Sequence, residues 1–285
     1  MFDTVIEMLS YPFMTRAFLV GSLVALCSAL LGVSLVLKRY SMIGDGLSHV
    51  GFGAMAIAAA MNAAPLTVAI PVVIVAAILL LRISGNAKIK GDAAIALIST
   101  TSLAVGVMVI SLTTGMNTDV YNYMFGSTLA MSAEDVKLSF VLSVFVLILF
   151  IVFYHKIFAI TFDETFARAT GVKAGVYNTL IAVLTAVTIV LGMRMMGALL
   201  ISSLIIFPAL TSMRVCRTFK SVIINAAVIS VVCLIAGVTL SYVAATPAGA
   251  SVVLANLVMM VLYTVVPNLV LVVFFKQKTA YEIHR

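Results

Sequence analysis

Electrical charge is what this sequence most lacks: Asp, Glu, Lys and Arg make up 9% of its 285 residues. Soluble domains carry about 25% charged residues, so a water-exposed globular protein is excluded. Apolar residues make up 64% of the chain, and its mean hydropathy is +1.25. The solvent of this protein is therefore lipid. Because the apolar runs are continuous rather than alternating, they predict helices and exclude a β-barrel.

Several chemical motifs are also missing. The three cysteines, Cys27, Cys216 and Cys233, form no CxxC pair, and we interpret them as small apolar core residues. There is no GxxxxGKS/T motif, so the chain does not bind ATP through a P-loop. HExxH and GxSxG are absent too, which argues against an enzyme. The net charge of +7 sits in short loops, where it reports topology rather than a nucleic-acid partner.

What the sequence does contain is a series of membrane-length apolar runs. A spanning helix needs roughly 17–25 such residues, and nine stretches qualify. The second is short and the seventh contains Pro208, so eight spans would also fit. The predicted fold is an all-α transmembrane bundle of eight or nine spans. The predicted spans are 17–37, 45–62, 64–81, 93–113, 136–154, 175–193, 195–213, 221–244 and 250–274.

Basic residues occupy every second loop. They follow the first, third, fifth and seventh spans, and only Arg16 and Arg194 break the pattern. The positive-inside rule then places the N-terminus outside and the C-terminus inside the cell. Residues 1–15 lack a basic n-region and contain Asp3 and Glu7, so we expect no cleavable signal peptide. The expected location is a cell membrane crossed several times.

One acidic residue and one histidine stand out at the start of the second predicted span. Asp45 and His49 are four residues apart in GDGLSHVGFG, so on a helix they share one face. Charged groups inside a membrane are costly and are functional candidates by default. A carboxylate oxygen with an imidazole nitrogen suits Zn²⁺, with Mn²⁺ as an alternative. The competing interpretation is a hydrogen-bonded Asp–His pair that only stabilises the bundle.

The fourth predicted span begins with another acidic residue. We expect Asp92 to be a helix N-cap, because anions are favoured at helix N-termini. The Ser99–Ser102 cluster either lines a wet path or bonds to its own helix backbone.

The longest basic loop holds a short helical segment, TFDETFARATGV, at residues 161–172. Thr161 and Glu164 fit a capping box, and Gly171 fits a helix stop. Phe162, Phe166 and Thr170 recur at four-residue intervals, which predicts one apolar stripe. A helix too short to span is expected to dock, either onto the membrane surface or onto a soluble partner.

The opposite side of the membrane carries an aromatic segment at residues 117–128. Tyr121, Tyr123 and Phe125 fit a membrane-interface belt, and a docking surface for an external partner is the sharper alternative.

Five stretches together give the sequence a family resemblance up to about residue 272. The chain resembles the permease subunits of bacterial zinc/manganese ABC importers, and 117–132 and 162–172 look most like the zinc branch. The stretches are SMIGDGLSHVGFG (41–53), NTDVYNYMFGSTLAMS (117–132), FDETFARATGV (162–172), MRMMGALLISSLIIFPAL (193–210) and TPAGASVVL (246–254).

The resemblance implies a role for each part. Two copies would form the membrane core, two cytoplasmic ATPase subunits would bind below, and an external binding protein would deliver the metal. Asp45 and His49 match the family's pathway motif. Some zinc permeases carry a further histidine in the fourth span, where this sequence has Ser99-Thr100-Thr101-Ser102. The cytoplasmic coupling helix that seats in the ATPase would use Asp163, Glu164, Phe166, Ala169 and Gly171.

The sequence therefore predicts the membrane subunit of an ATP-driven zinc importer working by alternating access. The alternatives are manganese or iron as the substrate, a secondary transporter driven by protons or sodium, and a membrane protein that does not transport. Few interior acids and no convincing internal repeat argue against the secondary transporter.

The predicted domain organisation is a single permease domain at 1–275 and a polar tail at 276–285. The run KQKTAYEI at 276–283 is what a common sequencing-library adapter encodes in one reading frame. We expect the tail to be an assembly artefact, the alternative being an ordinary polar tail.

Overall fold

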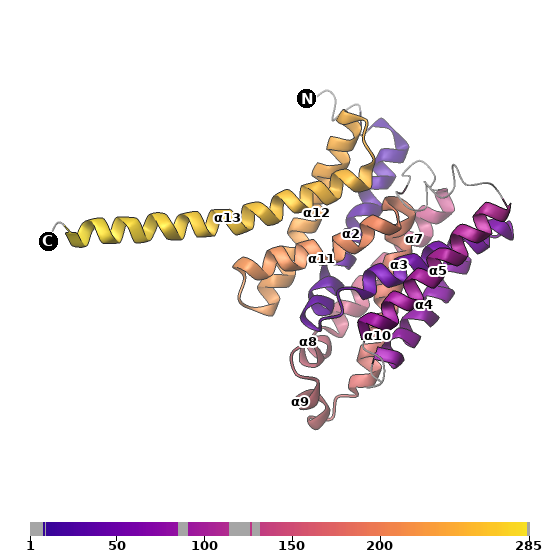
Figure 1. Cartoon of the computed structure of the whole chain (residues 1–285), viewed down its shortest axis with the longest axis horizontal. Coiled ribbons are helices and arrows are strands. Elements are labelled where there is room, and N and C mark those ends of the chain that lie inside the picture. The colour runs from indigo at the N-terminus through magenta and orange to yellow at the C-terminus, as the bar shows by residue number, and fades with distance from the viewer. Residues whose placement is uncertain (1–7, 9, 85–90, 114–125, 127–131, 284–285) are drawn as a thin grey trace.

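The computed structural model describes Met8, residues 10–84, 91–113, Gly126 and 132–283, with side chains at all of these except 12–13, 84, 199–200 and 266–283. This part of the chain consists of helices and connecting turns without a strand, which confirms the all-α class. Figure 1 shows them as a helical bundle with α8 and α9 at one end. The helices are α2 (Pro12–Leu37), α3 (Ile43–Ala60), α4 (Pro65–Ser84), α5 (Gly91–Thr113), α7 (Ala133–Val152), α8 (Tyr154–Phe162), α9 (Glu164–Ala169), α10 (Ala174–Met196), α11 (Ala198–Val215), α12 (Phe219–Ala244) and α13 (Ala248–Ile283).

Every predicted span corresponds to one of these helices. Among the described residues, eight helices are long and apolar enough to cross a membrane. The seventh predicted span is α11, whose apolar stretch Ile201–Val215 is shorter. The helix continues through Pro208, so the proline does not break it. In a bundle, neighbouring helices can satisfy the backbone carbonyl that a proline frees.

The helices divide into a packed centre and an outer layer. In α2, α3 and α10, 67–72% of the apolar window is buried, whereas in α4, α5, α7 and α13 it is 22–28%. The outer helices therefore present long apolar faces that only lipid or a partner chain can cover. This arrangement confirms a multi-pass membrane protein.

A close helix crossing fixes the position of α3 against α5. A Cβ added at Gly46 would lie 2.7 Å from Cγ2 of Ile95, and one added at Gly53 would lie 2.7 Å from the Ser102 carbonyl oxygen. Both distances are too short for a real Cβ, so only glycine allows this approach. The crossing brings the second and fourth predicted spans into direct contact along the stretch that carries Asp45, His49 and Ser99.

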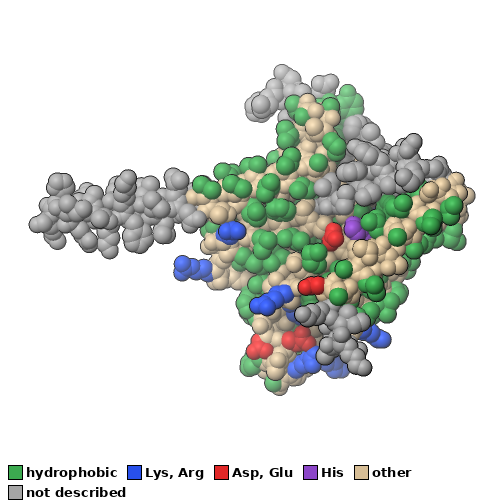
Figure 2. Space-filling model, viewed as in Figure 1, with side chains coloured by type: hydrophobic (Ala, Val, Ile, Leu, Met, Phe, Trp, Pro, Cys, Tyr) green, Lys and Arg blue, Asp and Glu red, His purple; other side chains and the backbone are tan. Residues whose placement is uncertain are grey.

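Charged side chains follow the predicted asymmetry on the face in Figure 2, where the Lys and Arg side chains lie in the half that holds α8 and α9. Arg194, an exception to the loop pattern, lies in the last turn of α10 and pairs with Asp135 of α7 (Nη2 to Oδ2, 3.5 Å). Both side chains are about 15% exposed, so the pair neutralises a basic charge at an end where few are expected.

Two smaller predictions have clear outcomes. Asp92 is the second residue of α5, two positions after the N-cap, so the N-cap assignment is wrong, although its charge still lies at the helix N-terminus. Cys27 and Cys233 are buried and Cys216 is half-buried, all without a disulfide. The interpretation of 276–285 as an assembly artefact stays a prediction. The aromatic segment also stays a prediction, because Tyr121, Tyr123 and Phe125 lie outside the described residues.

Candidate functional site

The Asp45–His49 pair occupies the first two turns of α3. From Ile43 through Ala56 these are the two residues that are not buried; the rest of that stretch is sealed by packing. Figure 2 shows one histidine side chain at the surface of this face, with an acidic side chain beside it. Both side chains are thus partly exposed, and they lie one turn apart on α3, as the spacing predicts.

The histidine is held by a partner on the neighbouring helix. Nδ1 of His49 lies 2.6 Å from Oγ of Ser99 in α5, and Ser99 is 6% exposed. Nε2 of His49 is buried and has no hydrogen-bond partner among the described residues. When Nδ1–H donates to the serine hydroxyl, Nε2 carries the lone pair that a metal ion requires.

The acidic residue is less constrained. Ser48 Oγ donates to the backbone carbonyl of Asp45 at 2.8 Å, which leaves the carboxylate itself outside this bond. No ion-pair partner of that carboxylate occurs in the part of the chain that the structure describes. One oxygen donor and one nitrogen donor are thus available one helical turn apart.

Two ligands form only part of a metal site. Within the described residues, no group of three or more His, Cys, Asp or Glu side chains converges. Structural zinc sites hold four protein ligands, so this pair does not build one alone. An incomplete site suits a cargo ion, which has to leave after it binds.

The segment 161–172 contains the last two residues of α8 and the whole of α9, rather than one helix. α8 ends at Phe162, and Asp163 adopts an extended conformation whose carboxylate accepts a hydrogen bond from the Phe166 N–H at 2.8 Å. Asp163 is therefore the N-cap of α9. The predicted capping box is wrong, because the Thr161 hydroxyl donates to the Ile157 carbonyl of its own helix at 2.7 Å instead.

Other features of the segment agree with the sequence. Gly171 follows α9 with a φ of +84°, the left-handed conformation of a helix stop, which confirms that prediction. Phe162 and Phe166 are 59% and 65% exposed, although they belong to α8 and α9 and form no stripe on a single helix. Asp163 and Ala169 are exposed as well, so this end of the molecule presents an open surface.

An aromatic cluster of Phe158, Phe162 and Phe219 packs the exposed end of α8 against α12. Phe158 and Phe162 of α8 both contact Phe219, the first residue of α12, with ring centroids 5.1 and 5.6 Å apart. Phe219 is 7% exposed, so it anchors the two partly exposed rings. Such pairs stabilise by about 0.5–1.5 kcal/mol beyond their buried area, which holds α8 against α12.

Glu164 is engaged inside the molecule. Its Oε2 accepts a hydrogen bond from Nδ2 of Asn178 at 3.0 Å and lies 3.5 Å from Nζ of Lys38, while Oε1 accepts from Arg168 at 2.5 Å. Burial would raise the pKa of Glu164, but the hydrogen bonds from Asn178 and Arg168 and the charges of Lys38 and Arg168 outweigh it, and the pKa is lowered. The carboxylate is therefore ionised at neutral pH.

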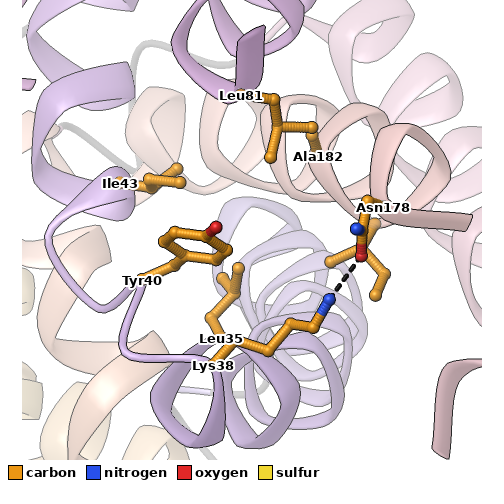
Figure 3. Close-up of a pocket in the computed structure, with 8 residues that line it drawn as sticks. Leu35, Lys38, Tyr40, Ile43, Leu81, Asn178 and Ala182 are labelled. Atoms are coloured by element: carbon orange, nitrogen blue, oxygen red, sulfur yellow. Dashed lines mark hydrogen bonds between the residues drawn. The ribbon is translucent and has the colours of Figure 1, made fainter. Parts of the chain in front are cut away.

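Lys38 completes this network from the end of α2. Its side chain is 9% exposed, and Nζ also donates to Oδ1 of Asn178, as Figure 3 shows. Burial lowers the pKa of Lys38, and the nearby Glu164 carboxylate opposes that effect. Lys38 is one of the basic residues that follow the first predicted span, and no sequence pattern singles out Asn178. Neither contact has a sequence signal. Lys38 and Asn178 are 140 positions apart, and Asn178 and Glu164 belong to different helices.

The described helices define a polytopic membrane protein with a polar pair on a central helix and exposed aromatic side chains at one end. The sequence profile of the ABC 3 transport family matches residues 10–267, and the chain belongs to this family.

The relatives include membrane subunits of metal transport systems. The chain is 30% identical over 246 residues to the high-affinity zinc uptake system membrane protein ZnuB of Haemophilus influenzae, covering 86% of this chain and 94% of that one. It is 27% identical over 248 residues to the manganese transport system membrane protein MntC of Halalkalibacterium halodurans, covering 87% and 85%. The structure of PsaBC from Streptococcus pneumoniae in complex with Fab matches with a TM-score of 0.83 and 27% identity, covering 92% of this chain and 95% of that chain.

Proposed function

We propose that this chain is the membrane-spanning permease of an ATP-driven importer of divalent metal ions, with Zn²⁺ as its preferred substrate. The observation that carries the proposal is the pair Asp45 and His49, the only unburied residues in the first fourteen positions of the central helix α3. Membership of the ABC 3 transport family supports ATP as the energy source rather than a proton or sodium gradient.

The preference for zinc rests on ligand chemistry. An imidazole nitrogen with an unused lone pair is a borderline ligand that suits Zn²⁺ better than Mn²⁺, which favours oxygen ligands. The relatives carry both zinc and manganese in their names, so likeness alone does not separate the two. Manganese and iron remain the alternative substrates.

In the proposed cycle, an external binding protein releases the ion to an outward-open cavity between two copies of this chain. Asp45 supplies a negative charge and His49 a neutral nitrogen, and both hold the ion briefly. A second copy would complete the ligand set, since the described residues of one chain supply two ligands. The outward face of α5 gives such a copy an apolar surface, since Leu97, Met108 and Leu112 are 62–78% exposed.

The ATPase subunits would dock on the surface formed by α8 and α9. Phe162 and Phe166 project from it, and Asp163 and Gly171 fix the start and the end of α9. Exposed aromatic side chains on a short helix are typical anchors at protein interfaces. ATP binding and hydrolysis would move this surface and open the cavity inward.

Uptake of radioactive zinc tests the proposal directly. We expect Asp45→Asn and His49→Gln each to reduce zinc uptake about tenfold or more in cells that also express the partner subunits. Each variant weakens one of the two metal ligands that this chain supplies, and the remaining ligand cannot replace it. Asp92→Asn is the matched control: the same change at an exposed position in α5 should leave uptake unchanged. Wild-type uptake by both pair variants, with normal amounts in the membrane, would reject the pair as pathway ligands.

Competition between metals tests the zinc preference. An excess of unlabelled Zn²⁺ should suppress uptake at lower concentration than Mn²⁺ or Fe²⁺ does. The reverse order would assign manganese or iron as the substrate while leaving the transport role intact.

A further inference from the structure

Lys38 is a charged side chain in an unusual position. It follows the last residue of α2, and its side chain is 9% exposed although a lysine at a helix end can normally reach water. Beside it lies a cavity of about 10 Å³, enough for roughly one water molecule, with Leu35, Tyr40, Ile43 and Leu81 among its walls. Figure 3 shows the amine directed along this wall to Asn178. The site therefore offers Lys38 few polar partners besides Asn178 and Glu164.

The network joins three separate elements. Lys38 comes from the end of α2, Asn178 from the first turns of α10, and Glu164 is the first residue of α9. Both polar groups of the Asn178 amide are used, since Oδ1 accepts from Lys38 and Nδ2 donates to Glu164. The Glu164 carboxylate thus faces inward and holds the docking surface to the bundle, while Phe162 and Phe166 face outward.

The same lysine begins the turn that leads into α3. Three backbone hydrogen bonds brace this turn: Arg39 N to Val36 O at 3.0 Å, Tyr40 N to Leu35 O at 2.8 Å, and Ile43 N to Tyr40 O at 3.0 Å. A turn bonded in this way moves with the helices that flank it. α3 starts at Ile43, and Asp45 is its third residue, so the turn connects Lys38 to the metal pair within one short stretch of chain.

We propose that Lys38 is a positioning residue that links the ATPase-docking surface to the metal pair: a displacement of α9 acts through Glu164 on Lys38, and through the α2–α3 turn on Asp45 and His49. The link rests on the proposed function, because it has a role only if α9 is moved by an ATPase. It adds a specific mechanical connection and separates the role of Glu164 from the roles of Phe162 and Phe166. Glu164 transmits movement, whereas the phenylalanines bind the partner.

The experiment measures metal transported per ATP hydrolysed. The permease is co-purified with its ATPase subunits, reconstituted into liposomes, and supplied with ⁶⁵Zn²⁺ on its binding protein. We expect Lys38→Met to retain the ATPase subunits and ATP hydrolysis while the ratio of zinc to ATP falls about tenfold, within the 5- to 150-fold range typical of coupling between sites. Arg39→Met, the same kind of change at the exposed neighbouring residue, should keep the wild-type ratio.

A second variant keeps the test informative if the buried substitution prevents folding. Glu164→Gln preserves shape at a half-buried position and should lower the ratio in the same way. In the double variant Lys38→Met/Glu164→Gln the two effects should not add, because both remove one link. Rescue by Lys38→Arg, which restores a cation, would support positioning by charge rather than by packing.

Each outcome separates the link from the proposed function. A wild-type ratio in Lys38→Met and Glu164→Gln overturns the link and leaves the importer proposal standing. Loss of the ATPase subunits from both variants also overturns it, since the residues would then only shape the docking surface. If the wild-type complex moves no zinc, manganese or iron, the proposed function itself fails.

Discussion

At the scale of single residues, three polar side-chain contacts join different parts of the helical bundle. His49 meets Ser99, Arg194 meets Asp135, and Lys38 meets Glu164, each with at least one member more than four-fifths buried. Unpaired polar groups are costly away from water, so each of these contacts stabilises the helix crossing that it joins, whereas Nε2 of His49 has no partner among the described residues.

Ser99 is the residue whose role is most easily isolated. We expect Ser99→Ala to raise the zinc concentration needed for half-maximal uptake about tenfold, because His49 loses the partner that fixes its ring, while maximal uptake changes less. Ser99→Thr retains the hydroxyl and should restore most of the affinity. An unchanged concentration dependence in Ser99→Ala would show that the contact only packs α5 against α3. Uptake measured over a range of zinc concentrations distinguishes these results.

At the scale of elements, the sequence predicted the helices well and their ends less well. Spans are predictable because apolar length is set by the bilayer, and all nine predicted stretches correspond to helices. The capping box at Thr161 failed because Asp163, two residues later, is the stronger cap and divides the segment into α8 and α9. Contacts such as His49–Ser99 and Lys38–Asn178 depend on how helices cross, and no local pattern encodes that.

The separate roles proposed for Glu164 and Phe166 in α9 lead to a prediction about assembly. We expect Phe166→Asp to reduce co-purification of the ATPase subunits at least several-fold, because it places a charge where an exposed aromatic ring would anchor the partner. The permease itself should stay in the membrane in normal amounts, since Phe166 is 65% exposed and contributes little to the core. Val176→Asp, a comparable change at a 61% exposed position in the first turn of α10, is the control. Equal co-purification of Phe166→Asp and the wild type would contradict the docking surface.

At the scale of the whole molecule, charge sets the orientation. The loop pattern places α8 and α9 inside and the α3–α4 connection outside, and the exception at Arg194 is neutralised by Asp135. Outer helices with largely exposed apolar faces leave room for lipid and for the second copy that the proposed pathway requires.

Cysteine labelling tests this orientation. In a Cys216→Ser background, Phe166→Cys should react with a membrane-impermeant maleimide only after the cells are opened, whereas Met61→Cys should react in intact cells. Both positions are suitable because their side chains are 65% and 69% exposed, and the two other cysteines are buried. The opposite labelling pattern would invert the topology.

The helix α10 is in close contact with other parts of the chain at both of its ends. Its first turns carry Asn178 in the Lys38–Glu164 network, and at its far end Gly126 approaches so closely that a Cβ there would lie 2.4 Å from the Met196 carbonyl carbon. Gly126 also has a φ of +80°, which disfavours a side chain in its own right. With 23 residues the helix is about 35 Å long, comparable to the thickness of a bilayer core. A rigid helix with contacts at both ends transmits a tilt from one side of the membrane to the other. In the proposed cycle, metal binding on the outside and nucleotide hydrolysis on the inside would therefore both act on α10.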